Sequence, residues 1–280
     1  GGRDARVMGN DIHPSAVGDR DAELGAGVRV RAHAVIGPDV VIGDDCEIGE
    51  AAQVMGPTRL GPGNRLYPKA TVGFDPQDLK WEGETVRLEV GEGNTFREFC
   101  TIHRGTGLGG GATTVGDGNL FMVYTHVAHD CHIGNHTIFS NNATLAGHVL
   151  VQDHSVVGAF SAVHQFCRVG PYAYVGGYTI VTKDALPFVK TVGQKPACYG
   201  VNRIGLERRG FDDRRIARLE AAMRILLRSG LNTGQALEKL RETWPEDPDV
   251  ALVADFVEAS ERGVIRNLPG SGRRRGGDAD

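Results

Sequence analysis

The 280-residue chain is poor in aromatic residues and has no long apolar run. Aromatic residues make up 6% of the sequence. Glycine accounts for 40 residues, about twice its usual share. Few large rings and many glycines predict a narrow interior of small and branched side chains, with many tight turns. No apolar run approaches the roughly 18 residues that span a membrane, and the first residues lack the apolar core of a signal peptide. We therefore expect a soluble, cytoplasmic protein with no membrane span.

The chain also has no excess of positive charge and no paired cysteine motif. Its formal net charge is −4 at pH 7, so there is no global basic field to attract nucleic acid. The five cysteines are odd in number and include no C-x-x-C pair, which argues against a disulfide framework and against a structural zinc site. We expect them to be small apolar residues of the core.

Aliphatic residues recur at every sixth position along most of the chain. One series runs from Ile12 to Val72, and a second runs from Val115 to Val181, one residue out of phase with the first. A hexad with one aliphatic residue and a small or turn-forming follower is the signature of a β-helix. Three hexads form one triangular coil of about 18 residues, and stacked coils pair as parallel strands. The class built from such hexads is known as left-handed, so we predict a mainly β fold: a left-handed parallel β-helix followed by a small C-terminal α-helical domain.

Breaks in the repeat predict where loops leave the wall of the β-helix. The β-helix is expected over residues 11–195. Asp78 and Glu84 occupy positions where the repeat requires an aliphatic residue, so a loop is expected over 74–89. The phase of the repeat shifts within 104–114, which predicts a second loop. Long loops on a regular scaffold are commonly functional.

The two ends of the chain differ from the repeat region. Residues 1–10 have no periodicity and are expected to form a disordered leader. Apolar residues at helical spacing predict a helical domain over 196–266, and 267–280 is expected to be a disordered tail. Within the helical domain, the expected helix caps are Asn232 or Thr233 for one helix and Asp247 or Asp249 for the next.

The stacking arithmetic brings polar residues into neighbouring columns. Residues 18 apart lie one coil apart in the same column, at a spacing of about 4.8 Å. Two adjacent columns are rich in polar residues: His129, Gly147 and Gln165 in one, and Asp130, His148 and Phe166 in the next. His126 and His164 lie in other columns, but within one or two coils. Any single histidine is more often an ordinary residue of a turn than part of a functional site. The group of His126, His129, His148 and His164 nevertheless favours a site.

This grouping has the residue types for acyl transfer to a hydroxyl group. An imidazole can remove a proton near neutral pH, and Asp130 is placed to orient the ring of His129. Gly147 can present its backbone N–H to an oxyanion without a side chain in the way. No serine or cysteine nucleophile lies in a recognisable elbow motif. Farther along, the 18-spaced pairs Gly158–Gly176 and Ala159–Gly177 predict a strip of small residues where an acyl chain could lie.

A zinc site is the alternative that the histidines leave open. His136, His154 and Tyr172 form another 18-spaced column, which we interpret as a surface ladder. Three histidines that meet across a subunit boundary can bind Zn²⁺ and leave a fourth position open, as in hexapeptide carbonic anhydrases. A non-catalytic hexapeptide scaffold is the third possibility.

Several ordered motifs together carry a specific family resemblance. They are Thr101-Ile-His-Arg-Gly-Thr106, His126-Val-Ala-His-Asp-Cys131, Asn141-Asn-Ala-Thr-Leu-Ala-Gly-His148, Val163-His-Gln-Phe166 and Val201-Asn-Arg-Ile-Gly-Leu-Glu-Arg-Arg-Gly-Phe211. Over residues 11–262 the chain resembles the hexapeptide-repeat O-acyltransferases that acylate UDP-N-acetylglucosamine at the start of lipid A synthesis. A related N-acyltransferase is expected to carry an additional N-terminal uridine-binding domain, whereas the hexads here begin by residue 12.

The resemblance implies an activity and a set of site residues. It implies transfer of an (R)-3-hydroxyacyl chain from acyl carrier protein to the 3-hydroxyl of UDP-N-acetylglucosamine, by a homotrimer whose sites lie between subunits. His129 matches the family's catalytic base, Asp130 its acidic partner and Gly147 its oxyanion-binding glycine. The residues that match substrate contacts are Asp78, Lys80, His126, His148, His164, Gln165, Gly177, Asn202, Arg208 and Arg209.

The resemblance also implies that no metal or redox cofactor is needed, because the phosphopantetheine arm arrives on the acyl carrier protein. Among these matches, Gly177 lies near the far end of the acyl groove, and Arg208 and Arg209 suit a diphosphate. Lys195 departs from the family, which often has histidine there. Basic residues at Arg214, Arg215 and Arg218 are expected to meet the acidic surface of the acyl carrier protein. A 3-hydroxyl and a 3-amine acceptor both remain compatible with the sequence.

Overall fold

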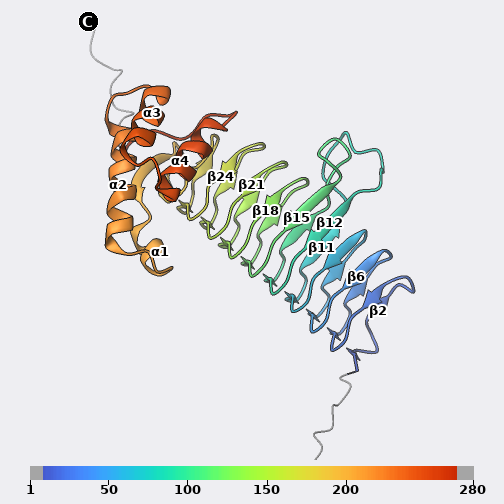
Figure 1. The fold of residues 1–280 in the computed structure, drawn as a ribbon. Helices are drawn as coiled ribbons and strands as arrows, with labels where there is room; N and C mark the ends of the chain where they lie inside the picture. The colour runs from blue at the N-terminus through green and yellow to red at the C-terminus, as the bar shows by residue number, and fades with distance from the viewer. Residues whose placement is uncertain (1–8, 270–280) are drawn as a thin grey trace, which may run out of the picture.

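The computed structural model describes residues 9–269, which form a long triangular prism with a cluster of helices at one end (Figure 1). Most of the predicted leader, residues 1–8, and most of the predicted tail, 270–280, lie outside the described residues. Within residues 9–269, no helix is both long enough and apolar enough to cross a membrane.

Three sheets form the faces of the prism, and we call them sheets A, B and C. Sheet A contains β1 (Asp11–Ile12), β4 (Arg29–Val30), β7 (Glu47–Ile48), β10 (Arg65–Leu66), β13 (Thr95–Phe96), β16 (Leu120–Phe121), β19 (Ile138–Phe139), β22 (Val156–Val157), β25 (Tyr174–Val175), β27 (Val189–Val192) and β28 (Ala197–Val201). Sheet B contains β2 (Val17–Gly18), β5 (Val35–Ile36), β8 (Gln53–Val54), β11 (Thr71–Phe74), β14 (Thr101–His103), β17 (His126–Val127), β20 (Thr144–Leu145), β23 (Ala162–Val163) and β26 (Ile180–Val181). Sheet C contains β3 (Glu23–Leu24), β6 (Val40–Ile42), β9 (Thr58–Leu60), β12 (Arg87–Val90), β15 (Ala112–Val115), β18 (His132–Ile133), β21 (Leu150–Val151) and β24 (Arg168–Val169).

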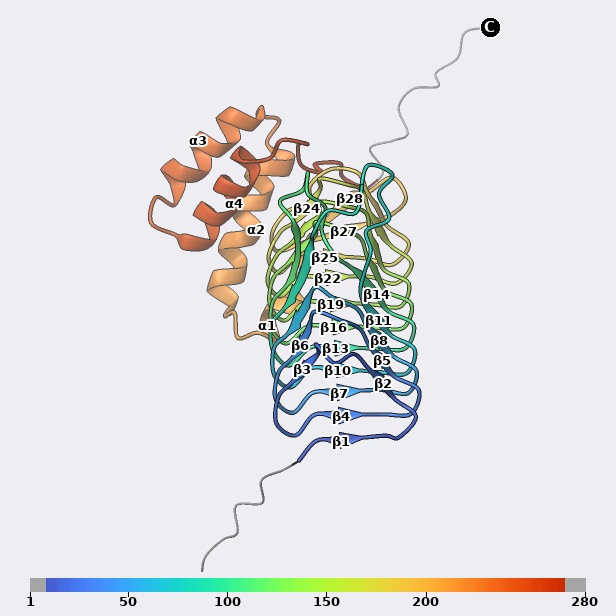
Figure 2. The same ribbon diagram turned by 90° about the vertical axis from the view of Figure 1, so that its right-hand side faces the viewer.

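Each coil pairs with the next through parallel strands (Figure 2). Outside the two loops the register follows the three-hexad coil, as in the pairing of His126 with Thr144 and of Thr144 with Ala162. In most two-residue strands the second residue is apolar and buried in the prism, as Val127, Leu145 and Val163 are. In β1 and β2, at the start of the prism, the corresponding Ile12 and Gly18 are exposed. The hexad prediction is therefore confirmed at the level of individual residues.

The interior of the prism contains two stacks in addition to its aliphatic columns. Phe121 is fully buried between Phe96 and Phe139, with ring centroids 4.9 Å apart on both sides. At one turn, the buried amides of Asn64, Asn94 and Asn119 form a ladder in which each amide hydrogen-bonds to the next at 2.9–3.0 Å. This ladder satisfies turn carbonyls that would otherwise lack a donor inside the prism.

The five cysteines are buried and free, as predicted. Burial raises the pKa of Cys100 and Cys131 to about 12. Their thiols therefore stay protonated at neutral pH and are poor nucleophiles.

The two loops occur where predicted, but both are shorter than predicted. The first loop spans residues 75–86 rather than 74–89, because Arg87–Val90 forms β12 and pairs with both β9 and β15. The second loop spans 104–111 rather than 104–114, because Ala112–Val115 forms β15. Backbone pairing to the coils on either side determines where each loop begins and ends, and the hexad pattern alone does not report it.

The helical end of the molecule begins later than predicted. Residues 197–201 form β28, which pairs antiparallel with β27 and belongs to sheet A rather than to the helical domain. The helices are α1 (Arg203–Glu207), α2 (Asp213–Arg228), α3 (Thr233–Thr243) and α4 (Pro248–Glu258). Asn232 caps α3 in a capping box and Asp247 caps α4, so one of the two candidates is correct in each case. The tail does not start at residue 267, because the Asn267 carbonyl accepts from the Cys198 N–H at 2.7 Å.

A ladder of stacked rings joins the prism to the helices. His136, His154 and Tyr172 stack along one edge of the prism, with centroids 5.2 and 4.8 Å apart. Tyr172 packs in turn against Phe211, which precedes α2. The guanidinium of Arg215 lies 3.5 Å from the centre of the Phe211 ring. The prediction that this column is a ladder is confirmed, and its rings stack on one another instead of converging on one point.

Candidate active site

One edge of the prism holds most of the predicted site residues. At this edge, which we call the B–C edge, every strand of sheet B except β26 is followed by a strand of sheet C. Both loops leave the prism there, since 75–86 joins β11 to β12 and 104–111 joins β14 to β15. The next three turns of the same edge carry His129–Asp130, Gly147–His148 and Gln165–Phe166. The prediction of shared columns is therefore confirmed, and the loops extend the same edge.

His129 and Asp130 form a hydrogen-bonded dyad on this edge. The distance from His129 Nδ1 to Asp130 Oδ2 is 2.7 Å. The side chain of Asp130 is fully buried, whereas 12% of the His129 side chain is exposed. Because a carboxylate only accepts hydrogen bonds, His129 carries its proton on Nδ1 and leaves Nε2 free to accept another.

The ring of His129 lies directly against Gly147. A Cβ atom at position 147 would come within 2.5 Å of His129 Cε1, so any other residue would displace the imidazole. Within residues 9–269, no group accepts a hydrogen bond from the Gly147 N–H. The edge therefore combines a free imidazole nitrogen and a free backbone donor on neighbouring coils.

His148 is the second imidazole near Asp130. Its Nε2 lies 3.7 Å from Asp130 Oδ2, and its ring stacks on Phe166 at 4.5 Å. Burial lowers the pKa of His148, and the nearby charges of Asp130 and Asp78 oppose that shift.

His126 lies on sheet B beside the dyad and contacts a histidine that the sequence analysis missed. Its Nδ1 is 2.7 Å from Thr101 Oγ1, and its ring packs edge-on against His103 at 5.2 Å. His103 Nδ1 donates to the Asp75 carbonyl at 2.6 Å and thereby anchors the start of the first loop. Across the second loop Thr101 pairs with His126, a separation wider than one coil, so counting in whole coils could not align the two strands. The motif Thr101–Thr106 was the available signal.

Other predicted contacts on this side of the prism lie on exposed segments. Asp78 Oδ1 accepts from the Lys80 N–H at 3.0 Å, so the two residues form one turn of the first loop. His164 and Gln165 are exposed, and His164 Nδ1 is 3.1 Å from the Gln165 carbonyl oxygen. Their side chains lie on the B–C edge without being fixed by the rest of the described chain.

The predicted nucleotide contacts lie on a different face of the molecule. Asn202, Arg208 and Arg209 line a cavity of about 440 Å³ between α1 and sheet A. Sheet A is the face opposite the B–C edge, so one chain does not bring these residues to His129. The Asn202 amide donates to the Tyr172 carbonyl at 3.2 Å, which makes it partly structural. Lys195 is exposed in the turn between β27 and β28.

The strip of small residues is narrower than predicted. Gly158 and Gly176 are buried, and a Cβ at either would come within 2.7 Å of the neighbouring coil or of Val192. Close packing of coils therefore requires these two glycines. Gly177 is exposed on the edge between sheets A and B, where a Cβ would meet only Ala159, at 3.3 Å or more. Of the two predicted pairs of small residues, only Ala159 and Gly177 therefore leave space beside the wall.

The basic residues expected to meet the acyl carrier protein are only partly free. Arg215 pairs with Asp249, and Arg218 pairs with Asp247, at 2.5 and 2.7 Å. These two therefore hold α2 to α4, which corrects the prediction for them. Arg214 is exposed.

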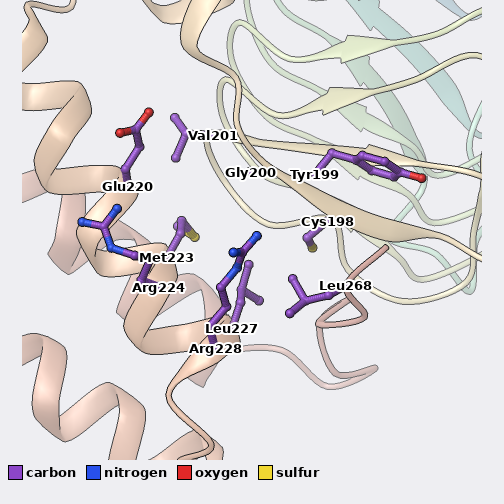
Figure 3. A pocket seen from close by; sticks show the side chains of 10 residues that line it. All are labelled: Cys198, Tyr199, Gly200, Val201, Glu220, Met223, Arg224, Leu227, Arg228 and Leu268. Atoms are coloured by element: carbon purple, nitrogen blue, oxygen red, sulfur yellow. The ribbon is translucent and has the colours of Figure 1, made fainter. Parts of the chain in front are cut away.

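A separate cavity between α2 and β28 presents two further arginines. It measures about 280 Å³, and Figure 3 shows Arg224 and Arg228 on α2 with Tyr199 across from them on β28. None of the predicted site residues lines it.

The zinc alternative can be tested against the donor atoms present. Within residues 9–269, His129, Asp130 and His148 form the one group whose candidate ligand atoms lie within 4.8 Å of one another. However, His129 Nδ1 is bonded to Asp130, and both oxygens of Asp130 accept hydrogen bonds from Thr106 at 2.7 Å. A metal ion would have to displace these bonds, so the arrangement fits an imidazole–carboxylate dyad better than a metal site.

The repeats and the helical end match two described families. The family "Bacterial transferase hexapeptide (six repeats)" matches residues 21–54 and 112–147. The family "Udp N-acetylglucosamine O-acyltransferase; Domain 2" matches residues 184–265. The prism thus has the repeats of a hexapeptide transferase, and the helical end has the second domain of one particular group within that class.

Relatives over nearly the whole chain identify that group. The chain is 43% identical to the acyl-[acyl-carrier-protein]–UDP-N-acetylglucosamine O-acyltransferase of Thermodesulfovibrio yellowstonii, covering 92% of this chain and 100% of that protein. It is 46% identical to the protein of that name from Halorhodospira halophila, covering 91% and 99%. The solved UDP-N-acetylglucosamine acyltransferase of Francisella novicida is similar at a TM-score of 0.89 and 33% identity, covering 92% and 95%. The chain belongs to the acyl-[acyl-carrier-protein]–UDP-N-acetylglucosamine O-acyltransferase family, and the predicted left-handed β-helix with C-terminal helices is confirmed.

The environment of His126 gives a testable pH dependence. Burial, together with the nearby His103 and His129, lowers the pKa of His126 to about 4, against about 6.5 in an unfolded chain. Between these values the unfolded state binds more protons, so this contribution to stability is present above about pH 6.5 and is lost as the pH falls towards 4. We expect His126→Asn to flatten the dependence of unfolding free energy on pH in this interval, measured by urea unfolding. Burial also lowers the pKa of His148, so the slope should decrease without vanishing; an unchanged slope would contradict the assignment.

Proposed function

We propose that this enzyme transfers an (R)-3-hydroxyacyl chain from acyl carrier protein to the 3-hydroxyl of UDP-N-acetylglucosamine, with His129 as the general base. Acyl transfer to this acceptor is the first step of lipid A biosynthesis. The observation that carries the proposal is the dyad beside Gly147, which combines a free Nε2 and a free N–H donor. We place the reaction in the cytoplasm, a reducing compartment that suits five free cysteines.

The mechanism follows from these two groups. His129 Nε2 removes the proton from the sugar hydroxyl as the oxygen attacks the thioester carbonyl carbon. The resulting imidazolium is stabilised by the Asp130 carboxylate through the 2.7 Å bond at Nδ1. The Gly147 N–H donates to the tetrahedral oxyanion. Collapse of this intermediate breaks the carbon–sulfur bond, and the imidazolium returns its proton to the leaving pantetheine thiolate. No step calls for a metal or redox cofactor.

We further propose that the working enzyme is a homotrimer with each site between two chains. The base lies on the B–C edge, whereas the arginines suited to the diphosphate lie over sheet A on the opposite face. A convex prism cannot enclose a substrate alone, and C₃ symmetry brings one chain's edge to the neighbouring chain's face. We propose a 3-hydroxyl acceptor and not a 3-amine because the relatives are named O-acyltransferases.

The role of His129 is tested by replacement with alanine. We expect His129→Ala to keep its fold and to lose at least about 10²-fold in turnover, the lower range for loss of general-base catalysis. Product mass from UDP-N-acetylglucosamine and 3-hydroxyacyl carrier protein is the readout. Treatment with a chelator should leave the wild-type rate unchanged. Near-normal turnover of the variant, or activity that returns only with added metal, would be incompatible with the mechanism.

The two-chain site is tested by complementation. His129→Ala and Arg208→Ala, each with its own affinity tag, are co-expressed and the mixed trimers are purified. Because one chain supplies His129 and the next supplies Arg208, about a third of the sites in the purified mixed trimers should be intact.

The matched control pairs two variants of the same edge. Co-expression of His129→Ala with Asp130→Ala should recover nothing, because every site then has one defective dyad. Equal activity in the two mixtures, or an active species near 30.0 kDa by light scattering, would exclude a site shared between chains.

The open position of Gly177 gives a prediction about chain length. A methionine there requires only a small adjustment of the wall, because the nearest atom to its Cβ is the Ala159 carbonyl oxygen at 3.3 Å. It should cover the distal part of the acyl strip while leaving the dyad intact. Each excluded CH₂ loses about 0.8 kcal/mol of burial, so Gly177→Met should favour a donor several carbons shorter, at similar kcat. Comparison of kcat/KM over donors of about 10 to 14 carbons provides the test, and an unchanged profile would remove Gly177 from the acyl path.

A further inference from the structure

We propose that Thr106 is a positioning residue for the reaction: it fixes the Asp130 carboxylate that orients His129, and the loop over residues 104–111 serves to deliver it. The inference rests on the proposed function of the dyad. It assigns a purpose to the phase shift in the repeat, which inserts this loop between β14 and β15.

Thr106 contacts both oxygens of the buried carboxylate. Its N–H donates to Asp130 Oδ1 at 2.7 Å, and its hydroxyl donates to Asp130 Oδ2 at 2.7 Å. His129 Nδ1 also donates to Oδ2, at 2.7 Å. The Asp130 N–H is held by Thr113 Oγ1 at 2.8 Å. The loop therefore holds the carboxylate and β15 holds the backbone of the same residue, and His129 is the remaining partner of the carboxylate.

The loop also fixes the direction of the Thr106 hydroxyl proton. The Gly109 N–H is shared between Thr106 Oγ1 and the Thr106 carbonyl oxygen, each at 3.1 Å. Since Thr106 Oγ1 is already an acceptor on this side, its one proton is directed to Asp130. The result is a chain of donors that runs from Gly109 through Thr106 to Asp130.

The close packing of Gly109 shows that the loop closes tightly over the carboxylate. A Cβ at position 109 would come within 2.0 Å of Asp130 Cγ. Thus the loop backbone at Gly109 forms part of the wall that excludes water from Asp130. Glu84 of the first loop accepts from the neighbouring Gly107 N–H at 2.9 Å, and this bond ties the two loops together beside Thr106.

A competing donor explains why the hydroxyl matters. His148 Nε2 lies 3.7 Å from Asp130 Oδ2, just beyond hydrogen-bond distance. With the Thr106 hydroxyl in place, Oδ2 already accepts from Thr106 and His129. Without it, the carboxylate can turn towards His148 and release the ring of His129. The titratable groups around His129 are Asp130, His148, His103 and His126, and Thr106 acts on the first of these.

The test compares Thr106→Val with Thr106→Ser. Valine keeps the backbone donor and the shape but lacks the hydroxyl, whereas serine keeps the hydroxyl. We expect valine to lower kcat by about 10- to 100-fold, by analogy with residues that orient a metal-binding side chain from behind it, with KM for the nucleotide sugar nearly unchanged. The basic group seen in the pH profile of kcat/KM should shift to lower pH, because the imidazolium of His129 loses its carboxylate partner when Asp130 turns towards His148. Serine should restore both kcat and the profile.

Thr114→Val is the matched control. Thr114 Oγ1 contacts His132 Nδ1 at 2.8 Å on sheet C, away from the dyad, and loss of this hydroxyl should leave kcat and the pH profile unchanged. Circular dichroism verifies that each variant is folded. The proposal is overturned if Thr106→Val retains kcat within about 2-fold, if serine fails to restore it, or if Thr114→Val has the same effect.

A double variant separates this inference from the function on which it rests. In the His129→Ala background, Thr106→Val should cause little further loss, because the residue it positions is absent. Full additivity of the two losses would overturn the positioning role while leaving His129 as the base. Wild-type activity of His129→Ala would instead overturn the proposed function itself.

Discussion

Backbone pairing between successive coils is the constraint on which the rest of this structure depends. Each strand of the wall hydrogen-bonds to the strand one coil earlier and one coil later, so a residue's place within its coil fixes the edge or face on which it lies. A residue inserted within a strand would move every later side chain to another position. Insertions are therefore confined to turns, and both loops of this chain lie at turns of the B–C edge. The same constraint that keeps the prism regular collects its irregular segments on one edge.

Because both loops lie on the B–C edge, the sequence could predict only part of the site there. Wherever the register follows the three-hexad coil, a count along the chain places side chains correctly, and His129, Gly147 and Gln165 are found in one column as expected. The count fails across the second loop, where Thr101 pairs with His126 and the inserted residues widen the separation beyond one coil. His103 and Thr106 precede that change of register, so a count along the chain does not place them beside His126 and Asp130. Their motif was visible in the sequence, but its distance from the dyad was not.

Whether a contact is local in sequence decides whether a second group of features could be predicted. Asn232 and Asp247 cap their helices as the residue types predict, because a cap depends on a side chain and on backbone N–H groups only two or three residues away. By contrast, β28 joins sheet A through antiparallel pairing with β27, and no hexad marks it. Ion pairs between residues far apart in sequence are likewise not predicted. From the sequence Arg215 and Arg218 are expected to be unpaired cations, whereas the fold pairs them with Asp249 and Asp247.

The shape of the prism then bears on how such an enzyme can hold its substrates. A triangular prism has three flat faces and three convex edges, so a single copy offers edges on which groups are presented but no enclosed space around them. The dyad is buried beneath the loop over 104–111, and 12% of the His129 side chain remains exposed. The exposed His164 and Gln165 lie farther along the same edge. The cavity lined by Arg208 and Arg209 lies across the prism, against sheet A. A ligand with a reactive hydroxyl at one end and a diphosphate at the other can reach both groups only if an edge of one chain faces sheet A of another. If two chains share the site as proposed, the regular wall fixes the geometry within each half of the site, and association of the chains sets the distance between the halves.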